Sequence, residues 1–217
     1  AAEANSWNGI ATDGAGTWIA VASTGTNRAM VSTDNGATWT ASNIGSRTWE
    51  SIEYGNGVWV AKAPGHLKRS TDNGGSWASE FAGSVSLSLI GRPAYGNGKF
   101  VVIGYDSGAS SSSVYTSADG ISWALVAVAS GYGSCVGFGL GLHALVLGVD
   151  GFSGGVYTSD DGGASWTPFP GPLNNVGTSG DWGFGPTAHI AFGQSAFTAL
   201  SRVGVSAWTE RNFADDS

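Results

Sequence analysis

A short segment that recurs four times along the chain constrains the fold more than any other feature of this sequence. It reads Ser-x-Asp-x-Gly-x-Thr/Ser-Trp in three copies, Ser32–Trp39, Ser70–Trp77 and Ser159–Trp166, and the copy Ser117–Trp123 is one residue shorter. The closing tryptophans are 38, 46 and 43 residues apart. Self-similarity at such a period is typical of repeat architectures, in which each repeat is one small supersecondary unit.

A second segment, in which glycines precede an aromatic residue, comes before each copy of the first. Clear copies are Tyr54–Trp59 and Tyr95–Phe100, and weaker ones are Asp13–Trp18, Phe138–His143 and Phe192–Phe197. The spacing gives five units of about 42 residues. Glycine and asparagine tolerate positive φ, so this segment predicts a tight hairpin turn. The aspartate of the first segment can accept hydrogen bonds from its own turn, which predicts a second turn in every unit that carries it.

The pattern between the turns predicts strands. Each unit reads as four short strands, and 36 glycines among 217 residues disfavour helices. Four-stranded units of this period are typical of propeller blades. The sequence therefore predicts an all-β fold, a five-bladed β-propeller of four-stranded antiparallel blades, as a single domain over residues 1–217. The expected blades are residues 7–48, 49–87, 88–131, 132–184 and 185–217, with the ring closing near the termini and the fifth unit lacking the aspartate turn.

The repeated segments resemble the bacterial neuraminidase repeat, or Asp-box (BNR), of sialidase-type β-propellers. Their pairing with the Tyr-Gly-Asn-Gly segment also resembles repeats of phage virion and tail proteins. The resemblance implies a non-catalytic binding or structural module of a virion, such as a capsid decoration, tail or receptor-binding protein. It assigns a structural role to the Asp-box residues Ser32, Asp34, Gly36, Trp39, Ser70, Asp72, Gly74, Trp77, Ser117, Asp119, Gly120, Trp123, Ser159, Asp161, Gly163 and Trp166.

Charge and composition narrow the partners. Nine Lys and Arg residues against sixteen Asp and Glu give a net charge of −7, which disfavours binding to nucleic acid and to anionic membranes. No apolar run is long enough for a membrane-spanning helix. We expect a protein partner on a virion or surface assembly, or a glycan, and a virion or extracellular location. No cofactor or metal is expected, because His66, His143 and His189 belong to different units.

The candidate ligand-binding residues lie in the variable loops and on the inner strands. Strand order places both kinds of turn on one face and the variable loops on the other, where binding residues are expected. The long loop at residues 167–186 mixes aromatic and amide side chains, which suits sugar recognition. The predicted ligand-binding residues are Arg47, Trp49, Arg92, Tyr105, Asp106, Tyr132, Asp150, Asn174, Asn175, Asp181 and Trp182.

Two other functions remain open at this point. One is a secreted or surface lectin. The other is a sialidase-like glycoside hydrolase, for which the resemblance implies three arginines, a Tyr–Glu pair and an aspartate. Arg28, Arg47 and Arg92 are available as the arginines, but no glutamate occupies a matching position, although Glu50 and Glu53 lie on a predicted inner strand. Catalytic residues are therefore not expected.

Overall fold

The computed structural model describes residues 3–79, 87–106, 111–130, 132–139, 142–149, 152–168, 182–184, 189–192, 198–202 and 208–212. In these residues, twenty strands form five four-stranded antiparallel sheets, no helix occurs, and the strands of each sheet pair in chain order. The first sheet holds β1 (Trp7–Thr12), β2 (Trp18–Ala22), β3 (Ala29–Ser32) and β4 (Thr40–Ser42). The second holds β5 (Ser51–Gly55), β6 (Val58–Ala63), β7 (His66–Ser70) and β8 (Ala78–Ser79).

The remaining three sheets repeat this order. The third holds β9 (Leu87–Gly96), β10 (Lys99–Asp106), β11 (Ser111–Ser117) and β12 (Ala124–Ser130). The fourth holds β13 (Tyr132–Gly139), β14 (Leu142–Val149), β15 (Phe152–Ser159) and β16 (Thr167–Pro168). The fifth holds β17 (Trp182–Phe184), β18 (His189–Phe192), β19 (Thr198–Arg202) and β20 (Trp208–Asn212). Trp182–Phe184, expected at the end of the fourth unit, thus pairs with β18 in the fifth sheet.

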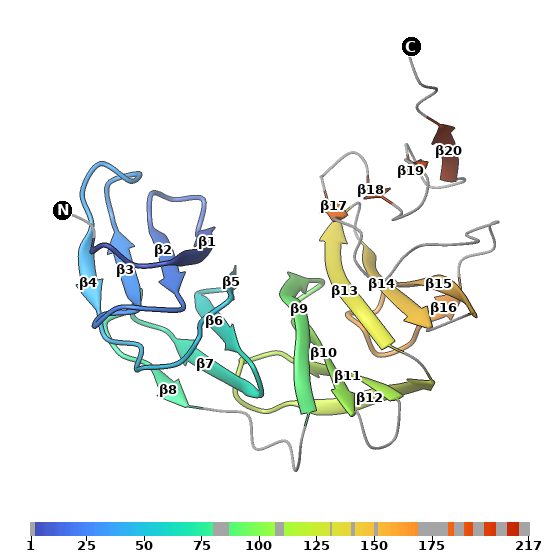
Figure 1. Ribbon diagram of the computed structural model, residues 1–217, viewed down its shortest axis with the longest axis horizontal. Helices are drawn as coiled ribbons and strands as arrows, with labels where there is room; N and C mark the ends of the chain where they lie inside the picture. Colours follow the sequence, from blue (N-terminus) through green and yellow to red (C-terminus); the bar gives the residue numbers. More distant parts are fainter. Residues whose placement is uncertain are drawn as a thin grey trace.

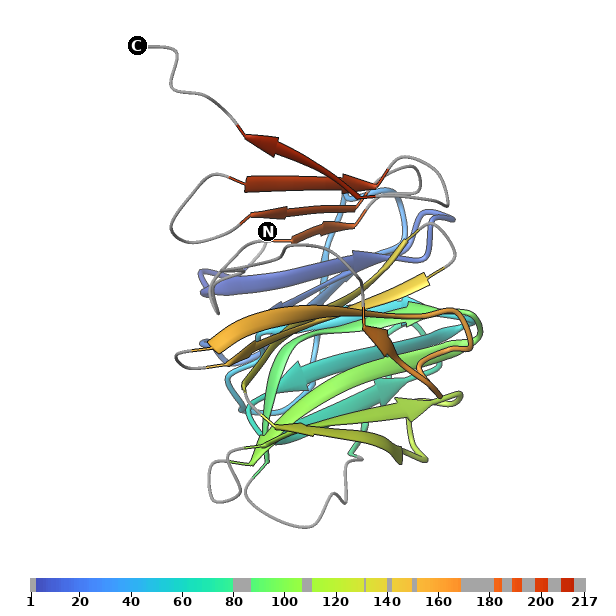
Figure 2. The ribbon, with the colours of Figure 1, turned by 90° about the vertical axis from the view of Figure 1, so that its right-hand side faces the viewer.

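The sheets follow one another around an axis, as the blades of a propeller do (Figure 1). The first strand of each sheet contacts the first strand of the next, β1 with β5, β5 with β9, β9 with β13 and β13 with β17. Seen from the side, the strands run along the short axis of the molecule, so that their connections gather at its two broad faces (Figure 2). The predicted all-β propeller of four-stranded antiparallel sheets is confirmed. That the ring holds five blades stays a prediction, because the described sheets form an open arc in Figure 1.

The glycine-rich segments form the predicted hairpin turns between the first and second strands. Asn56 and Gly57, between β5 and β6, have φ values of 48° and 79°. The preceding glycine, Gly55, lies in strand β5 and does not have a positive φ. A glycine is therefore required at this position for a different reason. A Cβ on Gly55 would lie 2.1 Å from Cγ of Tyr95, so only a glycine leaves room for the aromatic ring of the next sheet.

The core lies between successive sheets rather than inside one of them. Between the first and second sheets, Ile19 and Val21 pack with Ile52 and Trp59, and all four are buried. Equivalent clusters centre on Val60 and Phe100 between the second and third sheets, and on Val101, Ile103 and Val136 between the third and fourth. Because side chains alternate along a strand, neighbours such as Trp59 and Val60 serve opposite interfaces. Every sheet between two others therefore needs two apolar faces.

Candidate functional site

The four Asp-box carboxylates are bound within their own turns. In the second box, Oδ1 of Asp72 accepts hydrogen bonds from Ser70 Oγ (2.7 Å) and from the Ser76 N–H (2.8 Å), and Oδ2 accepts one from Ser76 Oγ (2.6 Å). The other three boxes repeat this arrangement with small variations. These hydrogen bonds to the charged form lower the pKa of Asp72 to about 2. Such carboxylates hold the turn together and are poor candidates for proton transfer.

In three of the units, the glycine of the Asp-box packs directly against the preceding sheet. A Cβ on Gly74 would lie 2.8 Å from Val31 Cγ2 of the first sheet, and one on Gly120 would lie 2.9 Å from Val60 Cγ2 of the second. Gly163 approaches Thr116 and Val101 of the third sheet equally closely. The tryptophans of these three boxes pack on the same apolar clusters. The Asp-box is therefore also a joint between sheets.

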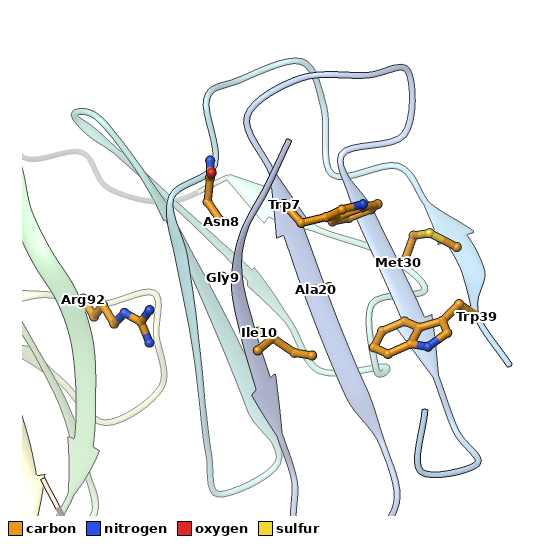
Figure 3. A pocket seen from close by; sticks show the side chains of 8 residues that line it. All are labelled: Trp7, Asn8, Gly9, Ile10, Ala20, Met30, Trp39 and Arg92. Carbon is orange, nitrogen blue, oxygen red and sulfur yellow. The ribbon is translucent and has the colours of Figure 1, made fainter. Parts of the chain in front are cut away.

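The first sheet has the same Asp-box glycine, Gly36, but no described sheet packs against it. Among the described residues, only the ring of Trp39 lies within 4 Å of where a Cβ on Gly36 would stand, at 3.9 Å. Ile10, which faces this side of β1, is 50% exposed. A cavity of about 420 Å³ opens here, and its lining residues are shown in Figure 3. These residues are Trp7, Asn8, Gly9, Ile10, Ala20, Met30, Trp39 and Arg92.

This side of the first sheet, defined by Ile10, Met30, Gly36 and Trp39, is called the open face below. Most of the polar groups that line its cavity already form hydrogen bonds within the protein. Trp39 Nε1 donates a hydrogen bond to the Gly36 carbonyl (2.9 Å), Trp7 Nε1 donates one to the Glu3 carbonyl (3.3 Å), and Asn8 Nδ2 donates one to the Trp49 carbonyl (2.9 Å). Arg92 is the charged side chain of the lining, and it reaches toward the face from β9 (Figure 3). The face therefore offers apolar surface with few free hydrogen-bonding groups.

Two glutamates on or beside the second sheet's inner strand have different environments. Burial raises the pKa of Glu53 to about 7, and the nearby positive charge of Arg92 opposes this rise. Glu50 instead forms an ion pair with the buried Lys62, with 2.5 Å between Nζ and Oε2. Glycoside hydrolysis ordinarily needs two carboxyl groups that flank the scissile bond. The two glutamates thus differ in environment, since Glu50 is ion-paired and Glu53 has a raised pKa.

Two features are absent from the described part of the chain, a metal-binding cluster and a membrane-spanning helix. Those residues contain no group of three or more His, Cys, Asp and Glu side chains that could hold a metal ion. They likewise contain no helix that is long and apolar enough to cross a membrane.

The predicted ligand-binding residues do not gather at one place. Arg47 is exposed in the loop before β5, whereas the ring of Trp49 in the same loop is fully buried and its Nε1 donates to the Gly45 carbonyl (2.9 Å). A ring in the core leaves no face for a ligand, so Trp49 serves packing. Arg92 is exposed on β9 and lines the cavity, and Tyr105 is half-buried in β10.

For the other predicted positions, the structure gives either the strand alone or no description. Asp106, Tyr132 and Trp182 belong to β10, β13 and β17. Asp150, Asn174, Asn175 and Asp181 lie outside the described residues, so binding there stays a prediction. Trp7, Ile10 and Met30 were not predicted as site residues, because the sequence makes the first unit look like its neighbours. Ile10 is distinguished by its exposure, which depends on what stands before the first sheet, whereas Met30 lines the cavity although it is only 3% exposed.

Comparisons with known proteins agree with this architecture. The BNR/Asp-box repeat model matches residues 30–41 and 157–168, which contain the whole of the first and fourth boxes. Among solved structures, YCF48 from Cyanidioschyzon merolae superposes with a TM-score of 0.62 at 16% identity, over 95% of this chain and 71% of that one. Virginiamycin B lyase from Staphylococcus aureus gives 0.69 at 13% identity, over 99% and 72%. At these identities the likeness concerns the fold.

A third similar structure is much longer than this chain. The GH74 enzyme from Niastella koreensis gives a TM-score of 0.64 at 22% identity, over 97% of this chain. The chain spans 31% of that enzyme. A comparison with curated protein sequences finds no match.

Proposed function

Since this chain is a β-propeller with BNR/Asp-box repeats, we propose that it is a non-catalytic binding and structural module that assembles through its open face. The observation that carries this proposal is the contrast between Gly36 and its counterparts. Gly74, Gly120 and Gly163 each meet side chains of a preceding sheet, whereas Gly36 has open space. The partner that fits is a sheet with aliphatic side chains at alternate positions, and the proposed source is a second copy of this chain.

Continuity with the interfaces inside the molecule supports a sheet as the occupant. In the first of these interfaces, Ile19 and Val31 of one sheet receive Gly74 and Trp77 of the next. The open face presents the same two elements, Gly36 and Trp39, with Ile10 beside them. A contact between different surfaces of two copies is heterologous, and such contacts build rings or filaments. Repeated assembly of this kind suits a component of a particle.

A protein partner fits the open face better than a glycan does. A sugar needs several hydrogen-bonding groups for its hydroxyls in addition to an aromatic face. Here the indole N–H groups of Trp7 and Trp39 already bind backbone carbonyls. Exposed apolar patches rimmed by polar groups are typical of protein–protein interaction sites, among other binding surfaces.

The biological setting belongs to the same proposal. The resemblance to phage virion and tail repeats favours a capsid decoration, tail or receptor-binding protein, on a virion or in an extracellular location. Catalysis is not part of the proposal, since the Asp-box carboxylates are held in their turns and Glu50 is held by Lys62. A net charge of −7 supports a protein partner over nucleic acid.

Sedimentation velocity over a wide concentration range tests the assembly, with Ile10→Glu as the disrupting variant. Ile10 is 50% exposed, so the substitution spares the core. The matched control is Leu125→Glu on the outer strand β12, where the side chain is 54% exposed. Burying one large aliphatic side chain contributes about 1.5–3 kcal/mol. Ile10→Glu is therefore expected to weaken self-association about 10- to 100-fold, while Leu125→Glu leaves it unchanged.

Three results would count against the proposal. A protein that stays monomeric at every concentration has no such interface. Equal weakening by both variants would place the contact elsewhere or show a general loss of solubility. Specific binding to a glycan array that Ile10→Glu abolishes would identify the open face as a sugar-binding site. The protein would then be a lectin rather than a self-assembling module.

A further inference from the structure

Four basic residues lie in or beside the loop between β4 and β5, and none of them belongs to the open face. Arg28, in the loop before β3, donates from Nη1 to the Arg47 carbonyl at 2.8 Å. Lys68, on β7, donates from Nζ to the Ile44 carbonyl at 2.7 Å. His66 begins the same strand, and Arg47 itself belongs to the loop. Arg28, Arg47, His66 and Lys68 are called the basic cluster below.

The positive charges of the cluster act on one another. Partial burial, together with the positive charge of Arg47, lowers the pKa of both His66 and Lys68. His66 and Lys68 are two residues apart on β7 and therefore point to the same side of the strand, and Lys68 Nζ reaches the loop that contains Arg47. The protein therefore holds like charges near one another, an arrangement that a bound anion would relieve.

The described residues provide no carboxylate partner for the cluster. The one ion pair among them joins Lys62 to Glu50, and Arg28 and Lys68 bond to backbone carbonyls instead. Glu3, close to the Arg28 loop in space, accepts hydrogen bonds from Asn27 and Asn5. Three of the chain's nine Lys and Arg residues thus gather at one place in a protein of net charge −7.

We propose that the basic cluster is a binding site for an oxyanion, a sulfate, phosphate or carboxylate that is either free or carried by a larger ligand. Guanidinium groups bind such groups through two parallel hydrogen bonds, and an ammonium adds a compact point charge. The carbonyls of Arg47 and Ile44 hold Arg28 and Lys68 in place before the ligand arrives, which reduces the entropy lost on binding. The basic cluster shares no residue with the open face. The proposed anion site can therefore be tested independently of the proposed assembly.

The imidazole of His66 reports on the site directly. Its NMR titration is followed in the full chain with and without sodium sulfate, with sodium chloride keeping the ionic strength constant. Only three histidines are present, and the His66→Gln variant assigns the signal. Sulfate is expected to raise the pKa of His66 from its lowered value, since a nearby anion favours the protonated ring.

Arg47→Gln is the decisive variant. Without sulfate it is expected to raise the pKa of His66, because a repelling charge is removed. It is also expected to weaken sulfate binding at least tenfold. Lys99→Gln, at the start of β10 beside the Gly-Asn-Gly turn, is the control and should change neither quantity.

Other outcomes would reject the anion site or identify the source of its ligand. If sulfate leaves the His66 titration unchanged, or acts equally on wild type and Arg47→Gln, the cluster is not an anion site. If a sulfated disaccharide binds at least tenfold more tightly than sulfate and loses this advantage in Arg47→Gln, the oxyanion belongs to an acidic saccharide. Equal affinity for both would identify a site for the free ion, which also upholds the proposal.

Discussion

A single aspartate in each repeat organises a complete turn. Asp72 accepts hydrogen bonds from the hydroxyls of Ser70 and Ser76 and from the Ser76 N–H, so one carboxylate fixes both ends of the turn. The hydroxyl of Ser70 in turn accepts from the Gly74 N–H at 2.8 Å. All of these contacts span at most four residues. This locality explains why the turn could be predicted from the sequence.

Acid is expected to destabilise the protein through these aspartates. The folded-state pKa values of Asp34, Asp72 and Asp119 are about 2, below the ordinary 3.8, so the unfolded chain takes up protons first as the pH falls. Their stabilising effect is complete above about pH 4 and disappears toward about pH 2. Thermal unfolding midpoints measured across this range should fall, and Asp72→Asn should fall less steeply. Parallel curves for the variant and wild type would contradict the assignment.

At the scale of the element, a four-stranded sheet is completed by its neighbours. Gly74 of the second sheet meets Val31 and Ile19 of the first, and Trp77 packs on the same cluster. The first and second Asp-boxes share their internal hydrogen bonds but differ in what lies outside them. This difference allows the packing between sheets to be measured apart from the turn.

The variants Gly74→Ala and Gly36→Ala form a matched pair. Both glycines have positive φ, 80° and 87°, so alanine costs about 1 kcal/mol of backbone strain at either site. At Gly74 the new methyl group also meets Val31 at 2.8 Å, which adds about 1–3 kcal/mol of overpacking. Chemical denaturation should therefore show the larger loss for Gly74→Ala. Equal losses would mean that a sheet also covers Gly36.

The limits of prediction from sequence also lie at this scale. Alternation in β6 predicts that Trp59 and Val60 face opposite ways, but not which neighbour each one meets. Trp49 was predicted to bind a ligand from the start of an inner strand, yet its ring is buried among Ile19, Ile52 and Ala63 of two sheets. The open face escaped prediction for the same reason. Local pattern fixes strands and turns, while burial depends on the neighbouring sheets.

The molecule as a whole is a series of sheets in which each contacts its neighbours in the chain. Stability in such arrays is close to a sum of unit terms and nearest-neighbour interfaces. The second and third sheets have described clusters on both faces, whereas the first has one only on the side of the second sheet. The first sheet is therefore expected to open more readily than the two that follow it.

Hydrogen exchange measured by mass spectrometry tests this order. Amide hydrogens of β6 and β10 should exchange at least tenfold more slowly than those of β2, since a difference of about 1.4 kcal/mol in opening free energy suffices. The measurement is made at low protein concentration, so that assembly does not protect the open face. Equal protection of β2 and β6 would show that another sheet stabilises the first one.

The contact between Gly55 and Tyr95 has a consequence for how such a molecule changes over generations. The third unit brings an aromatic ring, Tyr95, for the unit before it and a glycine, Gly96, for Phe138 of the unit after it. Both halves of the joint are encoded in the same stretch of about 42 residues. Duplicating a stretch of DNA that encodes both halves, as the third unit does, leaves the joints on either side of the copy matched. The number of units can therefore drift, while the rules for fitting one unit to the next stay the same.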